Sequence, residues 1–375
     1  METSEGGPTA ADAAGGGATG GGATTSAPSE RSGRPTRTRT RAGRLRIALP
    51  LRVMSALMLV TAAVGGTALA LRSGPTDPYL ATGDATTGSY VADRAGGDTA
   101  AAVVLAGPYT ERPGPPVTAR RAGVPGSGPA SRPVAAASTT PLPPIGALFS
   151  PGDDGDPTHH CTASVVHAPA GDLIATAAHC VHDGGFRTRL VFAPGLDGRF
   201  VPYGLWVPTR IVVHPRWISD RDPDHDVAFL RVRRAGAAGG RIEDVTGAER
   251  IRFDASTGRP ALLTGYPDNW DTPVSCRHTV EAQGPSQLRF PCPGFPNGTS
   301  GGPMLTDLDP ATGTGALIGV IGGLDEGGDD ATSYSSRFGP DTAALYRRAT
   351  SVPARDHGLQ DGRQRVPVGG REAGV

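Results

Sequence analysis

The sequence predicts an all-β fold, a barrel or a sandwich, over residues 145–350. Eight short runs in this stretch are rich in β-branched and aromatic residues, which suit the pleated, half-buried surface of a sheet. Clusters of Gly, Pro or Asp separate many of these runs, as turn residues separate the strands of all-β proteins. Only one segment has a convincing helical pattern, so we expect helices to contribute little.

The expected elements follow from these patterns in chain order. The helix is PDTAALYRRA at 340–349, which starts with Pro-Asp and places Ala344, Leu345 and Arg348 at helical spacing. The eight expected strands are ASVVHA, DLIATAA, RLVFAP, RIVVHP, DVAFLRV, PALLTGY, SQLRF and GALIGVIGG.

The regions on either side of this stretch have a different composition. Residues 1–52 are Gly, Ala, Ser and Thr repeats that end in an Arg-rich segment, and we expect them and residues 351–375 to be disordered. Residues 72–144 contain 12 Pro and 10 Gly, and their apolar surface is too small to offset the entropy of ordering. We therefore expect a flexible stalk there, with a pro-segment as the alternative.

A run of nineteen uncharged residues, 53–71, precedes this stalk. As a helix it would span about 28 Å, close to the thickness of the bilayer's hydrocarbon core. Residues 31–52 hold eight Arg and no acidic residue, so the positive-inside rule keeps the N-terminus in the cytoplasm. The run is either an uncleaved membrane anchor or a signal sequence cut after Ala68-Leu69-Ala70. Both predict an extracytoplasmic protein, anchored in the cell membrane or secreted.

The formal net charge of the chain is zero. This balance gives no reason to expect a nucleic-acid partner, and we expect neither a cofactor nor a metal. All four cysteines lie within residues 145–350, and an even number in an exported chain suggests two disulfides. Three pairings are possible, and we favour Cys161–Cys180 with Cys276–Cys292 because each would join neighbouring strands.

Three short motifs carry residues suited to nucleophilic chemistry. TAAHC contains His179, followed by a cysteine that can fix its loop. HDVAFL places Asp226 just before an apolar strand, where a buried carboxylate needs a donor such as an imidazole N–H. GTSGGP surrounds Ser300 with glycines, which allow a tight turn that points two N–H groups at one spot.

The order His, Asp, Ser with gaps of 47 and 74 residues resembles that of the chymotrypsin/trypsin-like serine proteases, especially the small secreted bacterial ones. The resemblance covers about residues 145–350. It implies two six-stranded antiparallel β-barrels with the active site between them, joined through Ala235–Arg250, and a short C-terminal helix. It also implies an exported serine endopeptidase that acts on proteins or peptides, and we expect a monomer.

The resemblance assigns roles to individual residues. Ser300 would be the nucleophile of an acyl-enzyme reaction, His179 the general base and acid, and Asp226 the residue that orients His179. The N–H groups of Gly298 and Ser300 would hold the oxyanion. Thr299 occupies the position of the aspartate that pairs with a new N-terminus in trypsin zymogens, so we expect no switch of that type.

The resemblance also identifies a substrate-binding pocket. The run from Gly319 to Leu324 would pair with the substrate backbone and line the pocket. Gly294, beside Phe295, stands where trypsin has an acidic pocket floor, and Ile321 stands where glutamyl endopeptidases have histidine. We therefore expect small or medium apolar residues before the cleaved bond, and neither Arg nor Lys. The expected substrate-binding residues are Gly294, Phe295, Ile321, Gly322, Gly323 and Leu324.

Four alternatives compete with these interpretations. The first is a zinc site built from Cys161, Cys180, His159, His160 and His182, although no CxxC pair is present. The second is a calcium loop at Asp220, Asp222, Asp224 and Asp226, although His225 and Arg231 stand where an EF-hand has Gly and Glu. The third is a catalytically silent, protease-like binding domain at the cell surface. The fourth is a lipase or esterase, but Pro303 and the absence of a following helix disfavour its nucleophile elbow.

Overall fold

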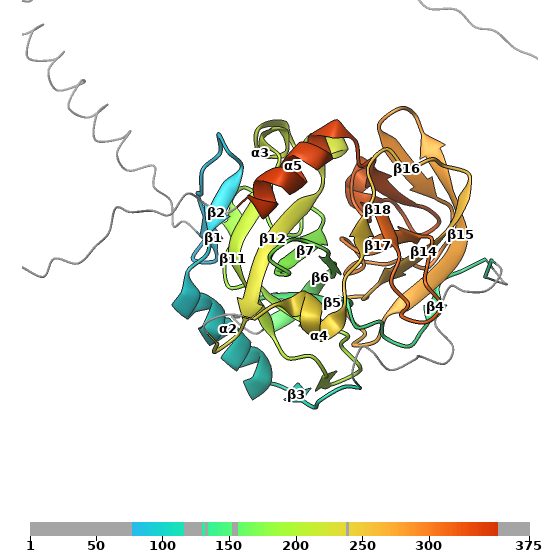
Figure 1. Ribbon diagram of the computed structural model, residues 1–375. Coiled ribbons are helices and arrows are strands. Elements are labelled where there is room, and N and C mark those ends of the chain that lie inside the picture. The colour runs from blue at the N-terminus through green and yellow to red at the C-terminus, as the bar shows by residue number, and fades with distance from the viewer. Residues whose placement is uncertain (1–76, 116–129, 132–133, 152–156, 238–239, 352–375) are drawn as a thin grey trace, which may run out of the picture. The chain divides into compact units, whose positions relative to one another are not determined.

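The computed structural model describes residues 77–115, 130–131, 134–151, 157–237 and 240–351. In this part of the chain two β-sheets lie side by side (Figure 1). Each of the eight expected strand runs overlaps a strand, and the expected helix is α5 (Pro340–Thr350). The all-β prediction is therefore confirmed. The expected leader, the apolar run 53–71 and all but the first residue of the expected tail lie outside the described residues.

The first sheet closes into a barrel. Its strand order is β12-β7-β6-β5-β9-β11, and β12 also pairs with β11. Because β11 pairs with β12, the sheet closes, and these six strands have no free edge. Strand β2 adds to the outside of β11 as a seventh strand. The strands are β2 (Ser89–Val91), β5 (Ile145–Pro151), β6 (Pro157–Val166), β7 (Leu173–Thr176), β9 (Val191–Pro194), β11 (Trp206–Val213) and β12 (Ala228–Arg234).

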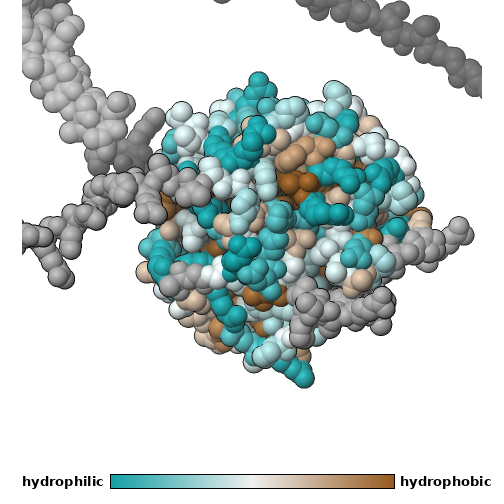
Figure 2. All heavy atoms as spheres, in the orientation of Figure 1, coloured by the Kyte–Doolittle hydropathy of each residue, from teal (hydrophilic) through white to brown (hydrophobic). Residues whose placement is uncertain are grey.

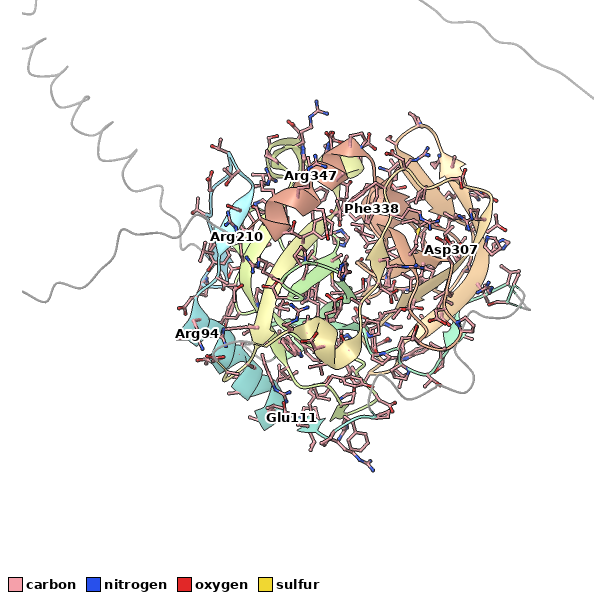
Figure 3. The ribbon with its side chains drawn as sticks, in the orientation of Figure 1. Arg94, Glu111, Arg210, Asp307, Phe338 and Arg347 are labelled. Atoms are coloured by element: carbon pink, nitrogen blue, oxygen red, sulfur yellow. A yellow bond between two sulfur atoms is a disulfide. The ribbon has the colours of Figure 1, made fainter. Side chains whose placement is uncertain are left out.

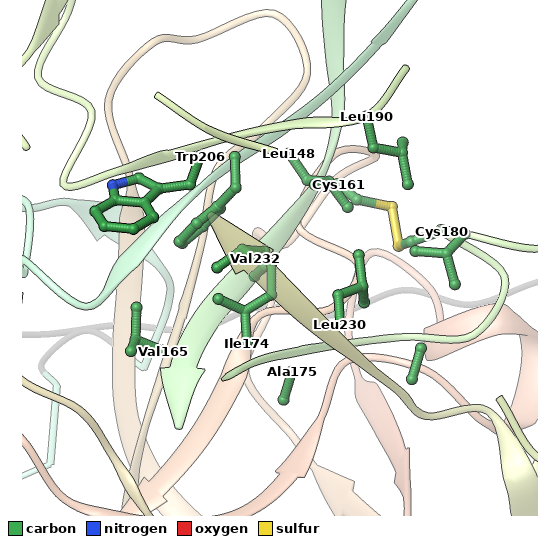
Figure 4. Close-up of a cluster of buried hydrophobic side chains, with 14 of the residues drawn as sticks. Leu148, Cys161, Val165, Ile174, Ala175, Cys180, Leu190, Trp206, Leu230 and Val232 are labelled. Atoms are coloured by element: carbon green, nitrogen blue, oxygen red, sulfur yellow. A yellow bond between two sulfur atoms is a disulfide. The ribbon is translucent and has the colours of Figure 1, made fainter. Parts of the chain in front are cut away.

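Apolar side chains fill the interior of this barrel (Figure 4). Leu148, Ile174 and Leu230 are fully buried, and Trp206 is 1 % exposed. The indole N–H of Trp206 donates to the carbonyl of Tyr203 at 3.0 Å, so its burial leaves no polar group unpaired. Truncating one such side chain to Ala typically costs about 2–5 kcal/mol. The barrel therefore supplies a rigid frame for the loops at its ends.

The second sheet has eight strands and takes the place of the second of the two expected barrels. Its order is β13-β18-β17-β14-β15-β16-β19, with β4 paired to β15. All pairs are antiparallel except β13 with β18, which is parallel. The strands are β4 (Ala137–Ser138), β13 (Arg250–Ile251), β14 (Arg259–Gly265), β15 (Val274–Gln283), β16 (Gln287–Phe290), β17 (Pro303–Thr306), β18 (Ala316–Val320) and β19 (Ser333–Ser336).

Residues 77–115 are folded against the first barrel, which differs from the expected flexible stalk. Helix α2 (Arg94–Ala106) begins at Asp93, whose side chain caps the N–H of Gly96. Its buried residues Gly97, Ala100, Ala101 and Val104 recur at helical spacing. This spacing indicates a helix, whereas the prediction of a flexible stalk used composition alone. Arg233 binds Asp98 at 2.7 Å and ties the helix to β12. The small side chains of α2 bury enough surface to hold the helix in place because it packs against the first barrel.

Short elements complete the described fold. Helix α4 (Ile242–Thr246) lies in the predicted connection between the sheets, and α3 (Pro215–Asp220) and the 3₁₀ turn η1 (Pro223–His225) precede β12. A second 3₁₀ turn, η2 (Leu324–Gly327), follows β18. Two small sheets join β1 (Leu80–Ala81) to β8 (Phe186–Arg187) and β3 (Thr110–Glu111) to β10 (Phe200–Val201).

The surface is predominantly polar on the face shown in Figure 2, where apolar residues form small separate areas. Ion pairs lie on the protein surface. For example, Asp307, labelled in Figure 3, pairs with Arg252 and Arg259. Exposed pairs of this kind contribute roughly 0–1 kcal/mol each. None of the helices in the described part of the chain has the length and hydropathy needed to cross a membrane.

Glu249, just before β13, is fully buried. Burial raises the pKa of its carboxyl to about 8, although the N–H of Gly315 donates to one carboxyl oxygen. The other oxygen, Oε1, has no hydrogen-bond partner among the described residues. Between about pH 4.5 and 8 the folded protein therefore binds a proton that the unfolded chain releases. Its stability falls as the pH rises through this window.

We predict that Glu249→Gln removes this pH dependence. As the pH rises from 5 to 8, the free energy of unfolding of the variant should increase relative to that of the wild type. The difference should reach up to about 3 kcal/mol at pH 7. Urea unfolding of both proteins at pH 5, 7 and 9 measures the difference. Parallel stability curves for the two proteins would contradict a protonated Glu249.

Candidate active site

Strand register brings His179 and Asp226 together. Ala228 of β12 lies opposite Thr176 of β7, so the segment that follows β7 and the segment that precedes β12 meet at the same end of the barrel. His179 Nδ1 lies 2.8 Å from Asp226 Oδ2, and the backbone N–H of His179 donates to Asp226 Oδ1 at 2.9 Å. The two residues, 47 positions apart, thus form one rigid pair.

Asp226 is fully buried and fully hydrogen-bonded. Its side chain has no exposed surface, and besides the two bonds from His179 it accepts the N–H of Gly323 at 2.8 Å. A buried carboxylate without such donors would be expensive to keep ionised. Because Gly323 belongs to the second sheet's side of the molecule, the third bond joins the two halves at the carboxylate.

The electrostatics of this pair make His179 a stronger base than an ordinary histidine. Burial lowers the pKa of His179, but the charge of Asp226 and their hydrogen bond outweigh it and leave the pKa raised. Burial likewise opposes ionisation of Asp226, but His179 and the backbone donors hold its pKa below the ordinary value. Asp226 thus stabilises the protonated form of His179, as a residue that accepts and returns a proton requires.

Ser300 lies in a turn in which the positions of Gly298 and Gly301 can be occupied only by glycine. Gly298 has φ +89°, and a Cβ there would lie 2.1 Å from the nitrogen of Asp268. Gly301 has φ +80°, and a Cβ there would lie 2.1 Å from Thr176 Oγ1. The N–H groups of Gly298 and Ser300 donate to no atom within the described segments. Two free donors in one tight turn are what a developing oxyanion needs.

Thr162 in β6 is a residue of this site that the sequence did not reveal. Its hydroxyl donates to the carbonyl of Gly298 at 3.0 Å and accepts the N–H of Tyr266 at 2.8 Å. Its backbone N–H donates to the carbonyl of Ser300 at 2.7 Å. The side chain is completely buried. Thr162 thus fixes the loop of the second half against a strand of the first.

One open cleft of about 340 Å³ contains His179 and Ser300. Of the expected substrate-binding residues, Phe295 and Ile321 line it, whereas Gly294, Gly322, Gly323 and Leu324 do not. Gly322 and Gly323 lie behind it instead, where a Cβ on Gly322 would lie 2.9 Å from Asp226 Oδ2. Residues that the sequence did not single out complete the lining, among them His160, Arg187, Asn297, Asp325 and Glu326.

Ser300 and His179 form no hydrogen bond with each other in this structure, in which both side chains are described. Catalytic hydrogen bonds of substrate-free enzymes are often long and tighten only when substrate binds. What the geometry does establish is a shared cleft with a paired imidazole, a serine and two free N–H groups. This combination suits attack of a hydroxyl on a carbonyl.

Both predicted disulfides are present, Cys161–Cys180 and Cys276–Cys292. The first joins β6 to the residue after His179 and holds the histidine loop. It also rules out the zinc alternative, because disulfide sulfurs are not thiolate ligands. His160 is engaged as well, between Ser150 and the carbonyl of Cys180, and burial lowers its pKa to about 4.

The calcium alternative has no converging set of ligands among its four carboxylates. Asp222 caps η1 by accepting the N–H of Asp224, and Asp224 itself accepts a bond from Gln287. Asp226 is committed to His179. A further group that could hold an ion, His214, His225 and Asp341, lies at the start of α5, but His214 Nδ1 already accepts the N–H of Arg216.

Comparisons with known proteins agree with this geometry. A family model described as a trypsin-like peptidase domain matches residues 161–320. The protease Anisep from Arthrobacter nicotinovorans has 25% sequence identity and a TM-score of 0.50, covering 57% of this chain and 98% of its own. The thermostable serine protease AL20 from an extremophilic microorganism has 27% identity and a TM-score of 0.49, covering 56% and 97%.

A relative with a different description is the "Extracellular metalloprotease" of Bacillus subtilis (strain 168). It is 26% identical over 112 residues, 29% of this chain and 34% of its own length, so the chain spans about a third of that relative. Taken together, the matches and the fold show that the chain carries a trypsin-like peptidase domain. Both comparisons support a protease domain in this chain.

We predict that Thr162→Val lowers kcat for peptide hydrolysis at least about ten-fold with little change in KM, because the oxyanion loop loses its anchor. Tyr266 loses its acceptor, which should cost about 1–3 kcal/mol of stability. Thr306→Val is the matched control, since Thr306 is also buried and its hydroxyl donates to a carbonyl, that of Ala316. A kcat loss of equal size in both variants would show that Thr162 acts through stability alone.

Proposed function

We propose that this protein is an exported serine endopeptidase that hydrolyses peptide bonds through an acyl-enzyme on Ser300. The observation that carries the proposal is the fully buried Asp226, bonded to His179 in the cleft that Ser300 lines. A carboxylate placed there without a chemical purpose would be a liability, whereas it orients and stabilises a histidine that acts as base. Residues 145–350 form the proposed protease domain.

In the proposed mechanism Ser300 Oγ attacks the substrate carbonyl while His179 Nε2 takes its proton. The new C–O bond turns the carbonyl oxygen into an oxyanion, which the N–H groups of Gly298 and Ser300 bind. His179 then gives the proton to the leaving amine as the peptide bond breaks. Water, activated by the same histidine, releases the acyl group and restores the serine.

The substrate's acyl side would pair with the segment after β18. Of this segment, Ile321 lines the cleft, and the substrate would add to it in the manner of a further strand. Phe295 and Ile321, only 7% and 4% exposed, give the pocket apolar walls. These walls support the expected preference for small or medium apolar residues before the cleaved bond.

Export is supported by the two disulfides, which persist in oxidising compartments, and by the extracellular description of the B. subtilis relative. The uncharged run 53–71 would be the anchor or the signal. We also propose that the site needs no trypsin-type activation, because Thr299 is held by its own hydroxyl, which donates to the carbonyl of Pro296 at 2.7 Å. We expect the protease to work as a monomer.

The triad predicts a specific pattern of losses. Ser300→Ala and His179→Ala should each remove nearly all peptidase activity and leave melting temperature and disulfides intact. The double variant should be barely worse than either single one, because the residues act as a unit. Rates on a peptide substrate, measured for all three variants, make the comparison. Additive losses, or substantial turnover by Ser300→Ala, would overturn the assignment.

A further inference from the structure

The charged residues that line the cleft come from separate elements of the fold. On the side of the segment after β18, the charged lining residues are Asp325 and Glu326. On the side of the Cys161–Cys180 disulfide, the charged lining residue is Arg187. The described part of the cleft is thus lined by carboxylates from η2, after β18, and by a guanidinium from β8.

The two acidic residues face the acyl side of the proposed substrate. They belong to η2, directly after the segment that we propose pairs with the substrate backbone. Glu326 binds Arg221 at 2.6 Å, and Arg221 also binds Asp183 at 2.6 Å. One guanidinium is therefore shared by two carboxylates, and Asp325 adds a third. This part of the cleft carries net negative charge and disfavours an anion.

Arg187 differs from these residues because it has no acidic partner. No carboxylate lies within ion-pair distance of its guanidinium among the described residues, and its Nε is buried without a hydrogen-bond partner. A buried N–H of a charged group without an acceptor costs free energy that a bound acceptor would recover. Strand β8, which carries Arg187, is fixed by pairing with β1 and by the bond from Arg187 N to the Val181 carbonyl.

The surroundings of Arg187 leave this positive charge uncompensated. His160, which also lines the cleft, is held neutral by burial, which lowers its pKa to about 4. The disulfide beside it is also uncharged. A guanidinium stays protonated at any physiological pH and binds a carboxylate with two parallel N–H bonds.

We propose that Arg187 binds a carboxylate of the substrate on the leaving-group side of the cleaved bond. The proposal rests on the proposed serine endopeptidase function, and it deepens that function by naming a substrate class. The carboxylate is either an Asp or Glu side chain one or two residues after the bond or the free C-terminus of a short leaving segment. Both sources offer the same chemistry to the guanidinium.

Matched quenched peptides and the full-length protein test this proposal. The acyl side is kept constant, and the first or second residue after the bond is Glu or its neutral isostere Gln, within an amidated chain. A third pair has Gln at both positions and ends two residues after the bond, as a free acid or as an amide. The quantity measured is the ratio of kcat/KM between the anionic and the neutral member of each pair.

The wild type should prefer the anionic member of at least one pair by about ten- to hundred-fold, and the preference should shrink at high salt. Preference in the first pairs assigns a side chain, and preference in the third pair assigns the C-terminus. Arg187→Gln should bring the ratio close to one, because kcat/KM should fall much more for the anionic peptides than for the neutral ones. Arg187→Lys should keep part of the preference, since it keeps the charge but loses the fork.

Arg189→Gln is the matched control, because Arg189 lies two residues further along and over the Tyr79 ring but does not line the cleft. It should behave as the wild type. Equal rates for every anionic and neutral pair in the wild type, or an undiminished preference in Arg187→Gln, would overturn the proposal. Failure of the wild type to cleave any peptide would instead count against the proposed function itself.

Discussion

The buried carboxylate of Asp226 is the constraint on which the site depends. It has no exposed surface, so it must find its hydrogen bonds within the protein. Two come from His179 in the first barrel and one from Gly323 on the side of the second sheet. Assembling the histidine pair and docking the two halves are therefore one event. A shift between the halves would remove a donor from a buried charge.

Other polar contacts reinforce the same junction. Gln287 of β16 donates to the carbonyl of Pro223 at 3.0 Å and to Asp224 at 2.7 Å, so it holds the turn that leads to Asp226. Its own oxygen accepts the N–H of Leu324 at 3.3 Å. Thr162 likewise holds the loop that contains Ser300, by donating to the carbonyls of Gly298 and Ser300. The cleft is thus built from hydrogen bonds between elements far apart in the chain, which suits a site that must hold its geometry.

Local sequence patterns predicted those parts of the structure that local physics determines. The strand runs, the helix at 340–349 and the two disulfides between nearby cysteines could all be predicted, because each depends on residues close in the chain. The pairing of His179 with Asp226 could be inferred because the order of the motifs resembles a known family. The second sheet also includes the short strands β4 and β13, which no local pattern indicated.

Contacts made by distant residues could not be predicted in this way. Helix α2 is composed mainly of small residues. It is stabilised by packing against the first barrel, whose strands lie far from it in the sequence. Thr162 is one threonine among many until β6 lies beside the serine loop, 136 residues away. Arg187 likewise gains significance only because the fold places it in the cleft without an acidic partner.

The central claim is that His179, held by Asp226, activates Ser300. Labelling the full chain with a fluorophosphonate and measuring its intact mass tests this most directly, because the probe reacts with an activated serine and not with an ordinary one. We expect the mass of one probe to be added, peptide mapping to place it on Ser300, and His179→Ala to abolish the labelling. A protein that cleaves peptides but stays unlabelled, or carries the probe on another residue, would contradict the account.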